Sequence, residues 1–478
     1  MTLSIKSIGG TINEVPKVSN LRVISFDTKS IDIEYKVEDV ELTICRHYLL
    51  LNGAKKEITR DVGYESDTNI FIYKIPNLNR DTSYTIQIMA SDGHDEALSE
   101  AVHQKTQGAN IFGFRIYERN SNPSSAVVYT EGAVTVSPAT TDSLGGWENK
   151  WPYNKIRIVG FKNGVVVKEI KKENKAQYID GTSVGNDVDV MVEIPRIYWK
   201  TEQHSGGYEI KISDMQIDSS WQCYAHIKQS KILDYIYIGA YKGSEISGAL
   251  RSVKGQIPVS SKTIGQFRQM AWNRGDGYNQ NNSNWVKLLR ILFVLAFKTL
   301  NSKEVLGTGV IGNAATPKIT GGTYNKGMVY KSKNTNEQNC FLGIEDVFGN
   351  LYEFVDGIFC NSNMEILEAS TNCNFNDNHS GYTSQGRISQ ISGSGFIKTV
   401  YSTQGLLFLP KEGNGSESTF YCDDGVNTAN KNMFFGGAYT PNDYEPRVLY
   451  KGGIFENCFG TTNSEYERCY GARLMYFK

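Results

Sequence analysis

The first hundred residues alternate between apolar and polar positions with a period of two, which predicts short strands that share one core. The alternation is clear at residues 30–35 and again at 84–88. Asn52-Gly53 stands between two such runs and predicts a two-residue hairpin, because both turn positions favour positive φ. The pattern therefore predicts an all-β region that ends at a linker near residues 104–113.

Beyond that linker the pattern is again mostly strand and turn, with helical periodicity in two places. Residues 156–170 read as a hairpin around Asn163-Gly164. Thr263 and Gln266 have the spacing of a capping box and open a predicted helix over 263–274. Apolar residues at i, i+3 and i+4 predict a buried amphipathic helix over 285–299. We therefore expect a mainly β chain with an α+β C-terminal domain.

Composition narrows the class of function. At roughly 100–200 residues per domain, 478 residues suggest about two to four domains. The 50 Lys and Arg residues are balanced by 51 Asp and Glu residues, so the basic excess of a nucleic-acid binder is missing and no nucleic-acid partner is expected. The longest apolar run, 291–297, is far shorter than the ~20 residues of a membrane span, so no membrane insertion is expected.

Cysteines, histidines and the start of the chain bear on compartment and chemistry. The eight cysteines are irregularly spaced without a CxxC pair, which favours reduced thiols over a disulfide framework or a zinc finger. The six histidines form no HxH or HExxH spacing, so zinc hydrolysis lacks ligands. MTLSIKSIGG lacks the apolar core of a secretory signal, so we expect another route out of the cell.

Residues 15–107 resemble a fibronectin type III module, and residues 1–14 would be an N-terminal arm. The resemblance rests on Leu78, a short turn, and the run TSYTIQIMA at 82–90. It implies that Tyr84 is a corner tyrosine, with its ring buried and its hydroxyl bonded back to the turn backbone. Tyr35 or a neighbouring aliphatic residue replaces the usual tryptophan of the second strand. Such modules are spacers or binding surfaces, so the fold alone assigns no activity.

The segment GIEDVFGNLYEFVDG, 343–357, resembles the D-x-x-G-N-x-x-E-W-x-x-D motif of the formylglycine-generating-enzyme branch of the C-type lectin fold. Phe354 replaces the tryptophan and Asp356 falls one residue early. FFGGAY at 434–439 and YGARLMYF at 470–477 are similar to two further strands of that branch. Together with upstream segments, the order of these matches resembles phage tail proteins that carry this domain. The resemblance implies a β-rich first part at 108–260 and a C-type-lectin-like receptor-binding domain at 261–478.

The motif positions are expected to be structural. Gly349-Asn350 reads as a tight turn, and Glu353 and Asp356 follow at the i, i+3 spacing of a helix. We expect the two acids to cap loops or bond buried backbone, with a calcium or catalytic site as the alternative. Arg473 is expected to be buried and paired with an acid. The full set of motif positions is Gly349, Asn350, Glu353, Asp356, Gly436, Gly437, Gly471 and Arg473.

The resemblance also bears on catalysis. Formylglycine-generating oxidases need two closely spaced thiols for copper, and the matching positions here are Tyr450 and Phe455. Cys458 and Cys469 do not fall in register. We therefore expect no enzyme, no catalytic residue and no cofactor, with calcium the one metal kept open. A glycan-cleaving enzyme or an oxidase is the alternative from a different class.

The segment 438–470 interleaves aromatic rings with amides, a composition typical of binding loops. In lectin-like tail proteins this face varies and binds. Tyr444 follows a turn sequence, and Phe459 lies in a Gly-bounded loop without strand alternation, which predicts exposed rings. If the rings prove to be core, the loop 372–378 is the next candidate. The expected ligand-binding residues are Tyr439, Asn442, Tyr444, Arg447, Asn457, Phe459, Asn463 and Tyr466.

The resemblance as a whole implies a tail-fibre or tail-tip protein of a phage or phage-tail-like particle. It would bind a bacterial surface receptor, glycan or protein, without covalent chemistry, and would contact other tail or baseplate proteins. The virion would be made in the host cytoplasm and released by lysis. We expect a symmetric homo-oligomer, with a trimer favoured and Tyr235, Tyr237 and Tyr241 as contact area. A purely structural baseplate component is the alternative.

Overall fold

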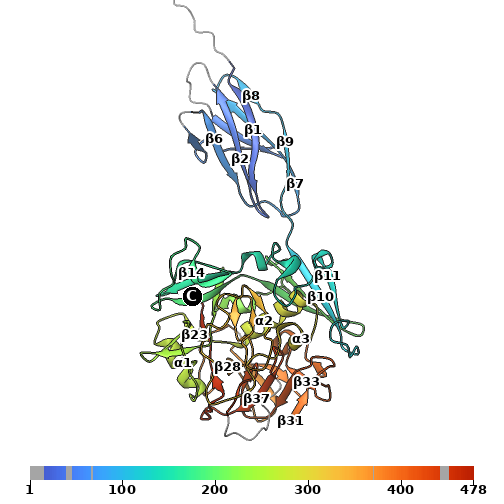
Figure 1. Cartoon of the computed structure of the whole chain (residues 1–478). Coiled ribbons are helices and arrows are strands. Elements are labelled where there is room, and N and C mark those ends of the chain that lie inside the picture. Colours follow the sequence, from blue (N-terminus) through green and yellow to red (C-terminus); the bar gives the residue numbers. More distant parts are fainter. Residues whose placement is uncertain (1–14, 39–45, 66–67, 370, 442–451) are drawn as a thin grey trace, which may run out of the picture. The chain divides into compact units, whose positions relative to one another are not determined.

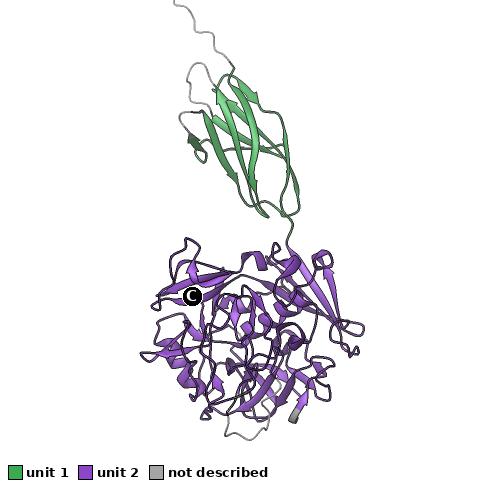
Figure 2. Cartoon of the chain, in the orientation of Figure 1, with its two compact units in different colours: residues 1–109 green, residues 110–478 purple. Residues whose placement is uncertain are grey.

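The computed structural model describes residues 15–38, 46–65, 68–369, 371–441 and 452–478. The chain divides into two compact units, residues 1–109 and 110–478 (Figure 2). The division lies close to the predicted end of the first module at residue 107. The described residues are mainly β, as the sequence pattern predicts, and their α-helices are α1 (Ile264–Trp272), α2 (Ser283–Phe297) and α3 (Ser302–Leu306). Within the described ranges, no helix has the length and apolarity needed to cross a membrane.

Unit 1 consists of two antiparallel sheets whose apolar faces share one core (Figure 1). Alternate residues of neighbouring strands point inward, which is why the period of two in the sequence marks them. In order, the strands of the first sheet are β1 (Lys17–Phe26), β2 (Ile31–Glu38), β6 (Ile70–Ile75) and β5 (Gly63–Glu65). Those of the second are β4 (Ala54–Glu57), β3 (Arg46–Leu51), β7 (Ser83–Ser91) and β8 (Glu96–Leu98), and β9 (Val102–Lys105) also pairs with β7.

Two local predictions for unit 1 are confirmed. Asn52 and Gly53 connect β3 and β4 with φ angles of 48° and 82°, the positive values that a two-residue hairpin requires. The Tyr84 ring is buried, and its hydroxyl accepts a 2.7 Å hydrogen bond from the backbone N–H of Asn79. Tyr84 therefore ties β7 to the turn that precedes it.

Unit 2 is built mainly from three sheets. The first contains β11 (Val127–Glu131), β10 (Ile111–Tyr117), β17 (Gly207–Ser213) and β16 (Tyr198–His204). The second contains β14 (Asn174–Tyr178), β13 (Val165–Lys171), β12 (Arg157–Lys162), β15 (Asp189–Pro195), β20 (Tyr235–Gly239), β39 (Leu474–Tyr476) and β23 (Tyr278–Gln280). The third contains β30 (Thr383–Arg387), β29 (Glu365–Glu368), β28 (Tyr352–Cys360), β35 (Lys431–Phe435), β37 (Asn457–Thr461), β34 (Asp424–Asn427) and β31 (Ile391–Phe396), with β38 (Tyr470–Gly471) beside β28.

Shorter pairs of strands complete unit 2, among them the hairpin of β18 (Ile227–Lys228) and β19 (Lys231–Ile232). The second large sheet pairs β20 with β39, and β39 with β23. These strands come from both sides of residue 260. The predicted division into 108–260 and 261–478 is therefore wrong as a domain boundary, because one continuous sheet joins the two segments.

Helix α2 lies within the core of unit 2, and all of its residues are buried (Figure 1). Its apolar residues surround the helix rather than forming one stripe, which is typical of a helix enclosed by other elements. Two cations on α2 are buried with it. Lys287 pairs with Glu368 at 2.7 Å, and Arg290 donates to the carbonyl oxygens of Ile454 and Glu456. Burial lowers the pKa of Arg290 to about 9.

Two local predictions for unit 2 are also confirmed. Thr263 and Gln266 form a reciprocal capping box at the start of α1, since each side chain bonds the other residue's backbone N–H. Asn163 and Gly164 connect β12 and β13 with φ angles of 51° and 80°. Helix α1 carries Trp272, which lines the candidate site, and Arg268, which bonds Asp377 in the loop beside that site.

Candidate functional site

The signature segment 349–357 lies in the core and has a structural role. Gly349 and Asn350 form the predicted tight turn with φ angles of 85° and 67°. The Asn350 amide donates to a carboxylate oxygen of Asp346 at 2.8 Å and to the backbone carbonyl of Lys318 at 3.0 Å. The i, i+3 spacing of Glu353 and Asp356 suggests a helix, but both residues lie on strand β28. The register of β28 with its neighbour β35 is irregular after Val355.

Glu353 pairs with two buried cations. Its Oε1 lies 2.6 Å from a guanidinium nitrogen of Arg473 and 2.7 Å from Nζ of Lys242, and Oε2 accepts from the Asn281 amide. Burial raises the pKa of the Glu353 carboxyl, but Arg473 and Lys242 more than offset this, so the pKa lies below its ordinary value. The prediction that Arg473 is a buried arginine paired with an acid is confirmed.

Asp356 is held in the same way by another cation. Nε and Nη2 of Arg268 donate to its two carboxylate oxygens at 2.7 and 2.9 Å. Because Glu353 and Asp356 are already neutralised by Arg473, Lys242 and Arg268, they do not fit a calcium site. Among the residues that the structure describes, no group of three or more His, Cys, Asp or Glu side chains is arranged to hold a metal ion.

The glycines of the motif are explained by close contacts. Gly436 and Gly437 have φ angles of 97° and 81°, and a Cβ atom on Gly437 would clash with the backbone of Gly452. A Cβ atom on Gly471 would lie 2.7 Å from Cδ1 of Leu351. These positions set the packing of the core and offer no group to a ligand.

The predicted C-terminal binding face is wrong for three of its described residues, Tyr439, Asn457 and Phe459. Tyr439 is 1% exposed, and Asn457 and Phe459 are 0% exposed. Asn457 and Phe459 lie on β37, which pairs with β35 on one side and β34 on the other. Because side chains project from the faces of a sheet, the burial of Asn457 and Phe459, and not the strand pairing, keeps them from a ligand. The run Asn-Cys-Phe-Gly-Thr shows no alternation, so the sequence pattern does not predict this strand.

The other residues of that predicted face differ in their surroundings. Asn442, Tyr444 and Arg447 lie outside the described residues. Tyr466 is 64% exposed. Asn463 is partly buried, and its amide donates to the carbonyl oxygen of Asp377 at 2.6 Å. Asn463 therefore supports the loop 372–378.

That loop borders a pocket of about 530 Å³, within the range of about 300–1,000 Å³ that small-molecule sites occupy. We call it the Trp272 pocket. Its walls come from Lys228 and Gln229, Trp272, the segment 275–279, the segment 372–375, and Phe477. The pocket thus joins the β18–β19 hairpin, the end of α1, the approach to β23, and the loop.

Asn372 fixes the first part of the loop. Its side chain is buried and donates to the carbonyl oxygens of Tyr224 and Ile227, both at 2.7 Å. It also accepts a 3.0 Å hydrogen bond from the amide of Asn284. Asn372 and Asn374 both have positive φ, 51° and 57°, a conformation that asparagine tolerates better than most residues.

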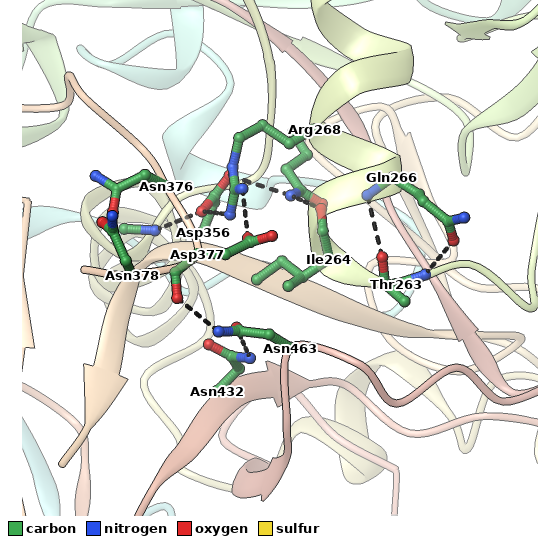
Figure 3. Close-up of polar contacts among 12 residues, drawn as sticks. Thr263, Ile264, Gln266, Arg268, Asp356, Asn376, Asp377, Asn378, Asn432 and Asn463 are labelled. Carbon is green, nitrogen blue, oxygen red and sulfur yellow. Dashed lines mark hydrogen bonds and ion pairs between the residues drawn. The ribbon is translucent and has the colours of Figure 1, made fainter. Parts of the chain in front are cut away.

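Asp377 fixes the second part of the loop, as Figure 3 shows. Nη1 of Arg268 donates to its carboxylate at 2.6 Å, so that Arg268 connects Asp377 with the buried Asp356. The backbone carbonyl of Asp377 accepts from Asn463, which in turn accepts from the amide of Asn432 at 2.7 Å. The loop is therefore anchored at both ends by buried or partly buried side chains.

Trp272 forms the aromatic side of the pocket and was not singled out from the sequence. It is 42% exposed at the end of α1, and its indole N–H donates to Oδ1 of Asn279 at 3.2 Å. The buried side of α1 carries Ile264, Phe267 and Ala271. A tryptophan that falls off the apolar stripe of a capped helix is the signal that could have identified the site.

The charged groups at the rim pair with one another. The Lys228 ammonium lies 3.7 Å from the Asp276 carboxylate, which also lies 3.2 Å from the Lys478 ammonium. Lys478 and Lys228 lower the pKa of Asp276, which keeps the rim carboxylate ionised. The described lining thus combines aromatic area and amides with a paired lysine and aspartate.

Comparisons with known proteins add no assignment. No protein-family model matches the chain, and no curated protein matches it. Among solved structures, a chimeric titin Z1Z2-Z1Z2 tandem shares 11% identity over 46% of this chain and 91% of its own, with a TM-score of 0.14. A point mutant of Kfla1895 in complex with isomaltose shares 9% identity over 39% of this chain and 28% of its own, with a TM-score of 0.15. Neither likeness supports an argument on fold or function.

Proposed function

We propose that the protein is a receptor-binding component of a phage tail or phage-tail-like particle, and that the Trp272 pocket recognises a ligand on the host-cell surface. The observation that carries the proposal is the pocket itself, with a half-exposed tryptophan, several amides, and a loop anchored at both ends. Such a preorganised polar and aromatic cleft lowers the entropic cost of binding. The predicted C-terminal face does not carry the proposal, because Phe459 and Asn457 are core residues.

The particle assignment rests on the resemblance of the sequence and on features that agree with it. For a fibronectin type III-like unit 1, the support is the order of its two sheets and the Tyr84 hydroxyl bonded to the turn. For a C-type-lectin-like unit 2, the support is the turn at Gly349-Asn350 and the Glu353–Arg473 pair that joins β28 to the closing strand segment. Location in a virion and contact with other tail proteins belong to the same proposal.

The proposed chemistry is binding without catalysis. Phe455, one of the two positions that align with copper-binding thiols, is a buried phenylalanine, and Tyr450 lies outside the described residues. Burial raises the pKa of the Cys469 thiol to about 12 and that of Cys458 well above its ordinary value, which disfavours the thiolates that copper needs. A Cys-x-Pro-x-Arg peptide should stay unconverted with copper present, and formylglycine detected by mass spectrometry would contradict this.

A homotrimer is part of the proposal, with one change to its expected contact area. Tyr241 is fully buried and cannot contribute, whereas Tyr235 is exposed. Multi-angle light scattering of the full chain at micromolar concentration should give three times the chain mass. A monomer mass would contradict assembly by this chain alone.

Adsorption to host cells tests the proposed function. The purified full chain should bind host cell walls and block adsorption of the particle. Trp272→Ala should weaken this binding by about 30-fold or more, while Tyr466→Ala, a matched change of an exposed aromatic outside the pocket, should retain it. A protein that neither binds cell walls nor blocks adsorption would be a structural component instead.

A further inference from the structure

Resting on the proposed function, we infer that the Trp272 pocket binds a neutral pyranose ring of a surface glycan. The proposal concerns the chemical class of the ligand. A pyranose has apolar C–H faces and a rim of hydroxyl groups, so it needs aromatic area and paired donors and acceptors in one small cleft. The Trp272 pocket supplies both, and its charges are already paired.

The charge of the lining favours a neutral ligand. Lys228 and Asp276 are the charged side chains that line the pocket, as far as the structure describes the chain, and they lie 3.7 Å apart. The Lys228 ammonium also lies 5.6 Å from the centre of the Phe477 ring. A phosphate or carboxylate ligand would have to compete with Asp276 for the lysine, and a cationic ligand would have to compete with the lysines for Asp276.

Among the described residues, four aromatic residues line the pocket: Trp272, Tyr278, Phe375 and Phe477. Phe375 and Phe477 are buried and meet edge to face, with their centroids 6.4 Å apart. Trp272 stands at the rim with its indole N–H already bonded to Asn279, so that its remaining exposed surface is apolar. This exposed apolar area matches the C–H face of a sugar ring.

Hydroxyl groups of the sugar would bond to two amides. Gln229 and Asn374 line the pocket from different segments, and neither side chain is buried. In the part of the chain that the structure describes, neither side-chain amide has a hydrogen-bond partner. Each amide offers a donor and an acceptor, the combination that a pair of neighbouring hydroxyl groups requires.

The two segments that carry these amides are tied together. The backbone N–H of Gln229 donates to the carbonyl oxygen of Thr371 at 2.8 Å, which joins the β18–β19 turn to the start of the loop. Asn372 bonds the carbonyl oxygen of Ile227, at the start of β18, and so braces the same junction. The two backbone segments are therefore held together before a ligand arrives, which lowers the cost of ordering them and favours a rigid ring over a flexible chain.

Cys373 provides a reporter inside the pocket. It is partly exposed, and its Sγ lies 3.1 Å from the hydroxyl of Thr371. The other described cysteines are buried. Cys45 lies outside the described residues, so the test protein carries Cys45→Ser. Alkylation by N-ethylmaleimide, followed by peptide mass spectrometry, then measures access to the Trp272 pocket.

The experiment compares neutral and charged probes on the full chain. The neutral probes are maltose, cellobiose, lactose and N,N′-diacetylchitobiose, and the charged probes are glucuronate, glycerol phosphate and glucosamine. At least one neutral probe should slow alkylation of Cys373 in a saturable way, and the charged probes should not. Trp272→Ala should raise the dissociation constant obtained from protection by about 30-fold, and Asn374→Ala by about tenfold. The Asn374 side chain is not buried, so its replacement should leave folding intact.

Every other outcome would overturn the inference. Protection by glucuronate or glycerol phosphate alone would make the ligand anionic, and absence of protection by any neutral probe would exclude a neutral pyranose as the ligand. If the Trp272→Ala and Asn374→Ala proteins were protected with the same dissociation constant as the wild type, these two side chains would not contact the sugar. If cell-wall adsorption is lost in Trp272→Ala while no neutral probe protects Cys373, the proposed function stands and the inference alone fails.

Discussion

Strand β37 and the loop 372–378 have similar sequences and opposite roles. Each begins Asn-Cys and carries a phenylalanine within the next two positions. In β37, Asn457 and Phe459 fall on one side of an extended strand and are fully buried. In the loop, Asn372 and Asn374 adopt positive φ, which breaks the extended conformation and leaves the Asn374 side chain accessible. Amide and aromatic composition therefore does not report exposure, because backbone conformation decides which side chains reach solvent.

The comparison predicts that changes near β37 and β28 lower stability and that changes at the Trp272 pocket lower binding. The largest loss of stability is expected for Glu353→Ala, which leaves Lys242 and Arg473 buried without their carboxylate. Breaking a buried ion pair on one side costs about 3–5 kcal/mol of unfolding free energy. Urea unfolding should show this loss, and a protein of unchanged midpoint would contradict the structural role of the motif.

Phe459→Ala should cause a loss of unfolding free energy nearly as large as that of Glu353→Ala. Removal of a buried phenylalanine ring costs about 3–5 kcal/mol, because the apolar contacts are lost and a cavity remains. Thermal and urea unfolding measure the effect, and cell-wall binding measured well below the transition should be retained. If Phe459→Ala kept wild-type stability but lost binding, the prediction that the C-terminal face binds the ligand would be supported after all.

The two buried asparagines give a matched pair with a smaller effect. Asn372→Ala removes three hydrogen bonds and leaves the carbonyl oxygens of Tyr224 and Ile227 without that donor, at about 1–3 kcal/mol. Within the described residues, the side-chain amide of Asn457 has no hydrogen-bond partner, so Asn457→Ala should change stability by under about 1 kcal/mol. Calorimetry of both variants tests this order, and a larger loss for Asn457→Ala would reverse it.

The smallest effect is expected for Tyr466→Ala. The ring is mostly exposed, and exposed substitutions usually change stability by under about 0.5 kcal/mol. Cell-wall binding should also be unchanged, because Tyr466 does not line the Trp272 pocket. A binding loss of more than tenfold, at unchanged melting temperature, would show that recognition involves the C-terminal segment after all.

Local sequence patterns predicted the fold better than they predicted the site. Turn residues with positive φ, such as Asn52-Gly53, and the capping box of α1 act through neighbouring backbone, so the sequence alone reveals them. The boundary at residue 260 failed because the pairing of β20 with β39 is set by packing between residues far apart in the chain. The Trp272 pocket combines five separate segments, and no local pattern reports that they meet.

Binding of Trp272→Ala to host cell walls, measured beside Tyr466→Ala and at matched stability, tests the central claim most directly. We predict that Trp272→Ala loses about 2 kcal/mol or more of binding free energy while Tyr466→Ala binds like the wild type. Wild-type binding by a folded Trp272→Ala protein would contradict recognition at the Trp272 pocket.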